Sequence, residues 1–172
     1  RDVRRGNRDF RKENFKEAEI EYRKGIVKDS LSVASNYNLA STLYRQNNAQ
    51  EAQKVLDRIK EVAPASEAAS DYYYNLGDAA LANQDYQTAV DAFKQSLLRN
   101  PSDLSAKENY LYAKEKLKDQ QQNQQNQDGQ NNQQNDDDQN KQDQKDQEKD
   151  QEKQDEVEQR NQYLPQIDRN DI

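Results

Sequence analysis

The first hundred residues of this chain repeat one pattern three times: a small residue, an alanine twelve positions later, and a large apolar residue four positions further on. The three copies are Gly6, Ala18 and Tyr22; Ala40, Ala52 and Leu56; and Gly77, Ala89 and Phe93. A fixed internal period is typical of proteins built from stacked repeats, in which each unit buries its apolar face against its neighbours. The pattern therefore predicts a solenoid.

The apolar residues within each copy have the spacing of an α-helix. Ala52, Val55, Leu56, Ile59 and Val62 follow an i, i+3, i+4, i+7 stripe. A similar stripe begins at Ala89, and a proline follows each of these two segments, at positions 64 and 101, where it ends the helix. A further stripe after position 103, with Asp103 as N-cap, predicts one more helix. We expect an all-α fold.

The third copy carries the fullest motif. Tyr73, Leu76 and Gly77 stand as W-x2-L-G would, and Ala89, Phe93 and Pro101 complete the series. In this it resembles the tetratricopeptide repeat (TPR), a helix-turn-helix unit of 34 residues. The resemblance implies a TPR solenoid in residues 1–118, with three repeats (1–32, 33–66 and 70–103) and a capping helix (103–118).

The copies also depart from one another. Asn36 stands where the second repeat should have a large aromatic residue, and the first repeat begins midway through its motif, so we expect further residues before Arg1. Three extra residues between the second and third copies are expected in the loop around 65–69, because loop insertions cost little. By position, Tyr73 is expected in the core and Tyr74 in the groove, whereas Tyr72 has no assigned place.

A polar tract follows the predicted repeats. From Asp119 to Glu156 every residue except Gly129 is Gln, Asn, Asp, Glu or Lys, with twelve acids against four lysines. Without apolar side chains to bury, residues 119–156 are predicted to form a disordered linker. Apolar residues return in 157–172, which we interpret as a short, truncated docking element.

Composition excludes several classes of function. The chain has neither Cys nor His, which removes thiolate and imidazole chemistry. A net charge of -7 argues against binding nucleic acid, and no apolar run is long enough to span a membrane. We predict that the protein is not an enzyme and assign it no catalytic residue, metal ligand or cofactor; the oligomeric state stays open.

In the tetratricopeptide family, the first helices of successive repeats line a concave groove that binds a partner protein or peptide. Aromatic side chains with a polar tip, together with Arg and Asn, suit such a surface. The positions that match it are Asn7, Phe10, Arg11, Tyr37, Asn38, Ser41, Tyr44, Arg45, Tyr74, Asn75 and Asp78.

One known binding mode of the family is excluded. Chaperone-binding members hold a peptide's terminal carboxylate with two Asn, two Lys and an Arg. Asn7 and Asn38 match the two Asn, but Val3 and Asp71 replace the Lys residues and Asn75 replaces the Arg. We therefore expect no such clamp.

The combination of three N-terminal repeats, the run Asn36–Ala40 and the Gln/Asn/Asp/Lys tail resembles the BatC family of the Bacteroides-type aerotolerance operon. This resemblance implies a role in oxidative-stress tolerance and membrane-anchored von Willebrand A-type partners. It also implies a bacterial cell-envelope location, on the periplasmic side or at the inner membrane, with the cytoplasm left open. Two alternatives remain: a co-chaperone or assembly factor of a secretion or pilus-type system, and an architectural protein that self-associates through its tail.

Overall fold

The structure is a computed structural model that describes the backbone of residues 2–163 and the side chains of 2–129, 145–147, 149–151 and 153–154. These residues form seven α-helices and one short 3-10 helix, and contain no strand. The all-α repeat fold is thus confirmed. The chain divides into two compact units, residues 1–120 and 121–172, and each is described by itself.

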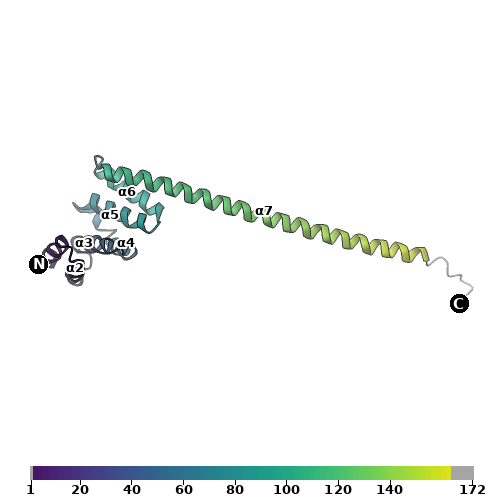
Figure 1. The fold of residues 1–172 in the computed structure, drawn as a ribbon, viewed down its shortest axis with the longest axis horizontal. Coiled ribbons are helices and arrows are strands. Elements are labelled where there is room, and N and C mark those ends of the chain that lie inside the picture. Colours follow the sequence, from purple (N-terminus) through teal and green to yellow (C-terminus); the bar gives the residue numbers. More distant parts are fainter. Residues whose placement is uncertain (1, 164–172) are drawn as a thin grey trace, which may run out of the picture. The chain divides into compact units, whose positions relative to one another are not determined.

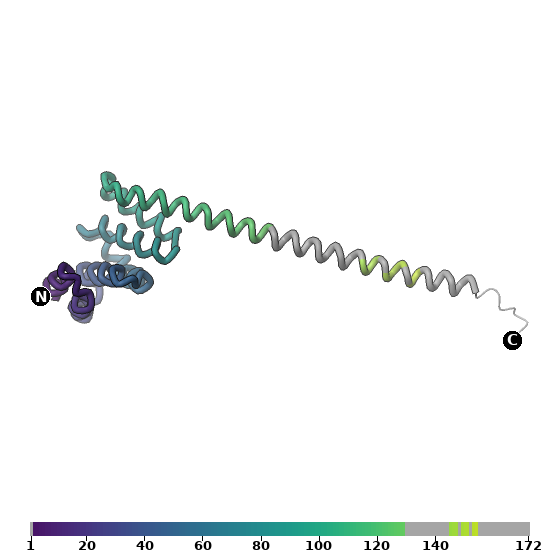
Figure 2. The backbone as a smooth tube through the Cα atoms, in the orientation of Figure 1, coloured from purple at the N-terminus to yellow at the C-terminus, as the bar shows by residue number. Residues whose placement is uncertain are grey.

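Three helix pairs build the first unit (Figures 1 and 2). They are α1 (Asp2–Arg11) with α2 (Phe15–Lys28), α3 (Val33–Arg45) with α4 (Ala49–Asp57), and α5 (Ala69–Ala82) with α6 (Tyr86–Arg99). Helices adjacent in sequence pack together, and the first helices α1, α3 and α5 also contact one another in series. The first helices therefore form one layer of the stack, which is the layer that positions the groove.

The turn inside each pair has the same backbone geometry. Glu13, Asn47 and Gln84 adopt positive φ angles of 59°, 60° and 60°, each one residue before the N-cap of the second helix. Two of these caps, Asn48 and Asp85, accept a hydrogen bond from the backbone N–H three residues on. A left-handed residue followed by a cap reverses the chain in few residues, so each pair closes tightly.

Small residues of the repeat pattern let the two helices of a pair approach closely. A Cβ atom on Gly77 would lie 2.7 Å from the Phe93 ring, and one on Gly6 would lie 2.4 Å from the Tyr22 ring. The large residue of each of these copies thus packs on the glycine of its own repeat.

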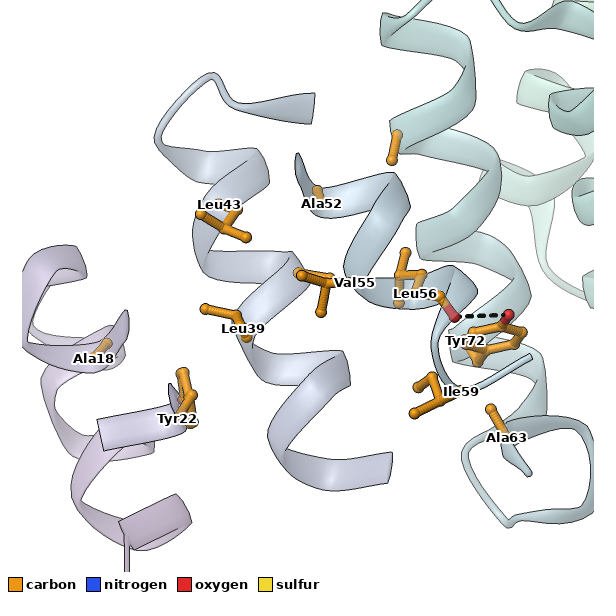
Figure 3. Close-up of a cluster of buried hydrophobic side chains, with 12 residues drawn as sticks. Ala18, Tyr22, Leu39, Leu43, Ala52, Val55, Leu56, Ile59, Ala63 and Tyr72 are labelled. Carbon is orange, nitrogen blue, oxygen red and sulfur yellow. Dashed lines mark hydrogen bonds between the residues drawn. The ribbon is translucent and has the colours of Figure 1, made fainter. Parts of the chain in front are cut away.

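The main apolar core runs along the stack from α2 to α5 (Figure 3). It includes Leu39, Leu56 and Ile59, all at most 1% exposed. Tyr72 is the buried tyrosine of α5, and its hydroxyl donates a hydrogen bond of 3.1 Å to the backbone oxygen of Leu56. Tyr73, expected in the core, packs against it but is only half-buried, and the guanidinium of Arg99 lies 4.7 Å from its ring centroid.

Asn36, which occupies an aromatic position of the motif, is completely buried. Its side-chain amide donates to the backbone oxygens of Ser30 and Ser32, at 3.0 and 2.9 Å. The amide therefore holds the loop before α3 in place. The loop between the second and third pairs contains the 3-10 helix η1 (Ala63–Ala65), and Ala63 is part of the core.

The last helix, α7 (Leu104–Tyr163), begins in the first unit. Asp103 accepts a hydrogen bond of 3.0 Å from the backbone N–H of Ala106, as expected of the N-cap. Ala113 packs with Ala89 and Phe93 in a second, smaller core cluster. This part of α7 thus covers the third repeat.

The remainder of α7 differs from the disordered linker expected over 119–156: its backbone is helical to Tyr163. A helix needs no apolar side chain to form its own backbone hydrogen bonds, and Gln, Lys and Glu are good helix formers. No proline occurs between Pro101 and Pro165, and Lys and acidic residues recur three positions apart from 145 to 156. Residues 164–172, most of the expected docking element, lie outside the described part of the chain.

Within the described residues, no helix combines the length and apolar character needed to cross a membrane.

Candidate functional site

Ten of the eleven predicted groove residues line two adjoining pockets. The α1–α3 pocket, of about 290 Å³, is lined by Asn7, Phe10, Arg11, Tyr22, Tyr37, Asn38 and Ser41. The α3–α5 pocket, of about 150 Å³, is lined by Phe10, Ala40, Ser41, Tyr44, Arg45, Ala52, Leu56, Asn75, Asp78 and Ala79. Phe10 and Ser41 line both pockets, so the two pockets adjoin along the three first helices, and together they are called the groove.

A series of asparagine hydrogen bonds joins the first helices. Asn38 of α3 donates to Asn7 of α1 at 3.1 Å, and Asn75 of α5 donates to Ser41 of α3 at 2.9 Å. Each bond links one first helix to the next. The side-chain amides of Asn38 and Asn75, which were predicted to bind a partner, therefore also hold the first helices together.

The third bond of the series involves a residue that sequence reasoning missed. Asn109 of α7 donates to Oδ1 of Asp78 on α5 at 3.1 Å. Asn109 lies 34 residues after Asn75, one repeat period, so the period itself was a signal that could have found it. The capping helix thereby continues the bonding pattern of the repeats.

Tyr22 is a second residue missing from the predicted set. Its ring is buried in the core, but its hydroxyl donates a hydrogen bond of 2.7 Å to Oδ1 of Asn7, and it lines the α1–α3 pocket. Burial raises the pKa of Tyr22 to about 12, so it stays a neutral donor near neutral pH. Its large-residue position in the motif pointed only to the core.

Tyr74 is the one predicted groove residue that lines neither pocket. Its ring packs edge-on against Phe93 with centroids 5.8 Å apart, and its hydroxyl accepts a hydrogen bond of 3.4 Å from Asn109. Tyr74, which is on α5, therefore contacts α6 through Phe93 and α7 through Asn109.

The aromatic side chains Tyr37 and Tyr44 are held differently. Tyr37 is half-buried in the α1–α3 pocket, whereas Tyr44 is 40% exposed at the α3–α5 pocket. Burial raises the pKa of both phenols, which are therefore neutral hydrogen-bonding groups at physiological pH. Both have the apolar ring and polar tip that protein-binding surfaces use.

Arg45 and Asp78 are the charged groups of the α3–α5 pocket. The Arg45 guanidinium lies 3.6 Å from Oε1 of Glu13 and 5.3 Å from the centroid of the Phe15 ring. Burial raises the pKa of Asp78 to about 6, against the opposing effect of its hydrogen bond from Asn109. The pocket thus contains one cation that is already paired and one poorly solvated carboxyl group.

The described residues lack the side-chain clusters that hold metal ions. They contain no group of three or more carboxylate, thiol or imidazole side chains that could hold a metal ion. What the groove does offer is aromatic surface, hydrogen-bonding groups and charge, as binding surfaces for protein segments do.

Comparison with known families agrees with this geometry. Two family models described as tetratricopeptide repeat match the chain, one over residues 31–97 and the other over 74–122. The chain therefore contains a tetratricopeptide-repeat domain. No curated protein matches it in sequence.

Among solved structures, the chain is similar to TPR domains of RPAP3. The first TPR domain of human RPAP3 has 20% identity and a TM-score of 0.63, covering 70% of this chain and 93% of that one. The first TPR of Spaghetti (RPAP3), bound to the HSP90 peptide SRMEEVD, has 21% identity and a TM-score of 0.62, with 67% and 90% covered. The second human domain, in complex with the HSP70 peptide SGPTIEEVD, has 21% identity and a TM-score of 0.59, with 66% and 92% covered. These likenesses establish the fold.

Proposed function

We propose that this protein is a non-enzymatic scaffold that binds a segment of a partner protein in the groove of its first helices. The observation that carries the proposal is the pair of adjoining pockets, lined by aromatic and polar side chains from α1, α3 and α5. Two similarly folded TPR domains hold chaperone peptides, which supports a peptide as the ligand.

The partner segment we propose differs from those chaperone peptides. Val3 and Asp71 stand where the carboxylate-binding members have Lys, and Asn75, in place of the Arg, is bonded to Ser41. A terminal carboxylate placed there would find no cation at these three positions and would lie near the Asp71 charge. We therefore expect an internal segment of the partner to occupy the groove.

Selection of peptides from a random displayed library tests this function. The purified chain should enrich a family of related sequences, and the variants Tyr37→Ala, Tyr44→Ala and Arg45→Ala should each weaken binding of the winning peptide. Tyr112→Ala is the matched control, because Tyr112 is 51% exposed on α7 and lines neither groove pocket. Failure to enrich any sequence, or equal binding by the groove variants, would overturn the proposal.

For the biological setting, we propose a Bat-type aerotolerance complex of the bacterial cell envelope, with membrane-anchored von Willebrand A-type proteins as partners. The support is the resemblance carried by Asn36–Ala40 and the polar tail. Co-purification from the native host tests it: von Willebrand A-type proteins should be recovered with the wild-type chain and lost with Tyr44→Ala.

The two alternatives give other results in the same experiment. Recovery of secretion or pilus subunits would favour an assembly factor. Recovery of the chain alone, as oligomers that disappear when the tail is removed, would favour the architectural role.

A further inference from the structure

Asp78 lies in the wall of the α3–α5 pocket with its charge uncompensated. Its carboxyl group accepts one side-chain hydrogen bond, from Asn109 at 3.1 Å. None of the ion pairs among the described residues includes Asp78. A carboxylate that is largely removed from water without a cation nearby is unfavourable, so the free protein leaves this group poised to bind a positive charge.

The other polar groups of the pocket do not neutralise Asp78. Arg45 also lines the pocket, but its guanidinium is engaged by Glu13 and by the Phe15 ring. The phenols of Tyr44, which lines the pocket, and Tyr74, which does not, are neutral near pH 7, because burial raises the pKa of each. The position opposite Asp78 is therefore open to a cation from outside the chain.

Ser41 and Asn75 of the lining are hydrogen-bonded to each other, and the rest of the pocket is apolar. Ala40, Ala52, Leu56 and Ala79 form its buried lining and are each 1% exposed. Phe10 supplies an aromatic wall from α1. The volume of about 150 Å³ is well above the roughly 10–15 Å³ that a single water needs. A lysine side chain has four carbons and one nitrogen, and such side chains bury the carbon stem along apolar surface while the ammonium keeps polar contact.

We propose that the α3–α5 pocket is a specificity pocket for a lysine side chain of the partner segment, with its ammonium against the Asp78 carboxylate. This inference rests on the proposed groove function and adds the chemistry that the groove selects. The methylenes contact the apolar lining and the aromatic walls. The ammonium replaces the lost hydration of the carboxylate, so the pairing discriminates against neutral and acidic side chains at that position.

The test uses the full chain and the random displayed peptide library in parallel selections on three proteins: wild type, Asp78→Asn and Asp91→Asn. The Asp78→Asn side chain keeps an oxygen for the Asn109 bond and removes only the charge. Asp91 is exposed on α6, so its variant controls for the change in net charge. Circular dichroism melting of each protein shows whether it is folded at the assay temperature.

Wild type and Asp91→Asn should enrich sequences with lysine in one fixed column, and Asp78→Asn should not. The best wild-type peptide is then synthesised with N-acetylated and amidated ends, with either lysine or norleucine in that column. We expect norleucine to weaken binding to wild type at least about tenfold, and to leave binding to Asp78→Asn unchanged.

Three outcomes count against the inference. Enriched peptides without a lysine column, or equal effects of norleucine on both proteins, would refute the lysine pocket and leave the groove function standing. No enriched peptide with any protein would overturn the groove function and the inference together.

Discussion

At the scale of single residues, Asp78 in the α3–α5 pocket lowers the stability of the folded protein at neutral pH. Its carboxyl group is largely removed from water, and burial raises its pKa from 3.8 to about 6. The protonated form is therefore favoured in the folded state. Asp78 contributes stability below pH 3.8, and this contribution is lost as pH rises through about 6.

Asp78→Asn should therefore be more stable than wild type at pH 7 by roughly 1–2 kcal/mol, a figure reduced for the solvent that reaches the pocket. The advantage should shrink as pH falls from 7 to 4, because the wild-type carboxyl group then becomes neutral. Urea denaturation of both proteins across this range measures it. A difference in unfolding free energy that does not change with pH would contradict the assigned environment of Asp78.

Gly77 provides the second residue-scale prediction. A methyl group at this position would lie 2.7 Å from the Phe93 ring, which is itself completely buried. Gly77→Ala should lose roughly 1–3 kcal/mol of stability from overpacking, in spite of the better helix propensity of alanine.

The matched control for Gly77→Ala is Gly129→Ala. Gly129 is also helical, but nothing lies within 4 Å of the position where its Cβ would be. The unfolding free energy of the repeat domain, measured in urea, should be unchanged in this control. Equal stability of Gly77→Ala and wild type would show that the two helices of the third repeat are not in close contact.

At the scale of elements, the left-handed residue in the turn of each helix pair affects the unfolding free energy by an amount that substitution can measure. Gln84 holds a φ of 60°, where a side chain costs about 1 kcal/mol and glycine costs much less. Gln84→Gly should raise the unfolding free energy by roughly 0.5–1 kcal/mol. Gln87→Gly, in the first turn of α6, should lower it, because glycine loses more backbone entropy on forming the helix and removes the hydrogen bond from the Gln87 amide to Asp91.

Two substitutions of the same type should thus shift the urea midpoint in opposite directions. A decrease in both would mean that the turn before α6 is not left-handed. Glu13 and Asn47 have the same geometry, but the analogous change at Glu13 should gain less, because it also removes the ion pair with Arg45.

At the scale of the whole molecule, the two compact units predict separable behaviour. A chain ending at Gln120 retains both core clusters and all three helix pairs. Its thermal midpoint should agree with that of the full chain within a few degrees, while the helical circular dichroism signal lost on truncation should correspond to the residues removed from α7. A large fall in the thermal midpoint would show that the tail stabilises the repeats.

Much of this architecture could be read from residue spacing, because helical repeats bury residues at a fixed period. The same spacing did not distinguish Tyr72 from Tyr73. Neighbouring residues lie about 100° apart around the helix axis, and the rotation of α5 about that axis decides which of the two is buried. Nor did it foresee that α7 continues past residue 118. A disordered linker was predicted because this tract has no apolar side chains to bury. A helix, however, satisfies its backbone hydrogen bonds without them.

The sequence by itself determined the class of this protein: the threefold pattern of small, alanine and large residues specifies helix pairs that can only bury their faces by stacking. It also contained ten of the residues that line the groove. Only the tertiary structure decided how those residues are used. Asn38 and Asn75 bond neighbouring first helices, and Tyr74 packs between helices outside the groove. Packing places Asp78 in the α3–α5 pocket, where burial raises the pKa of its carboxyl group.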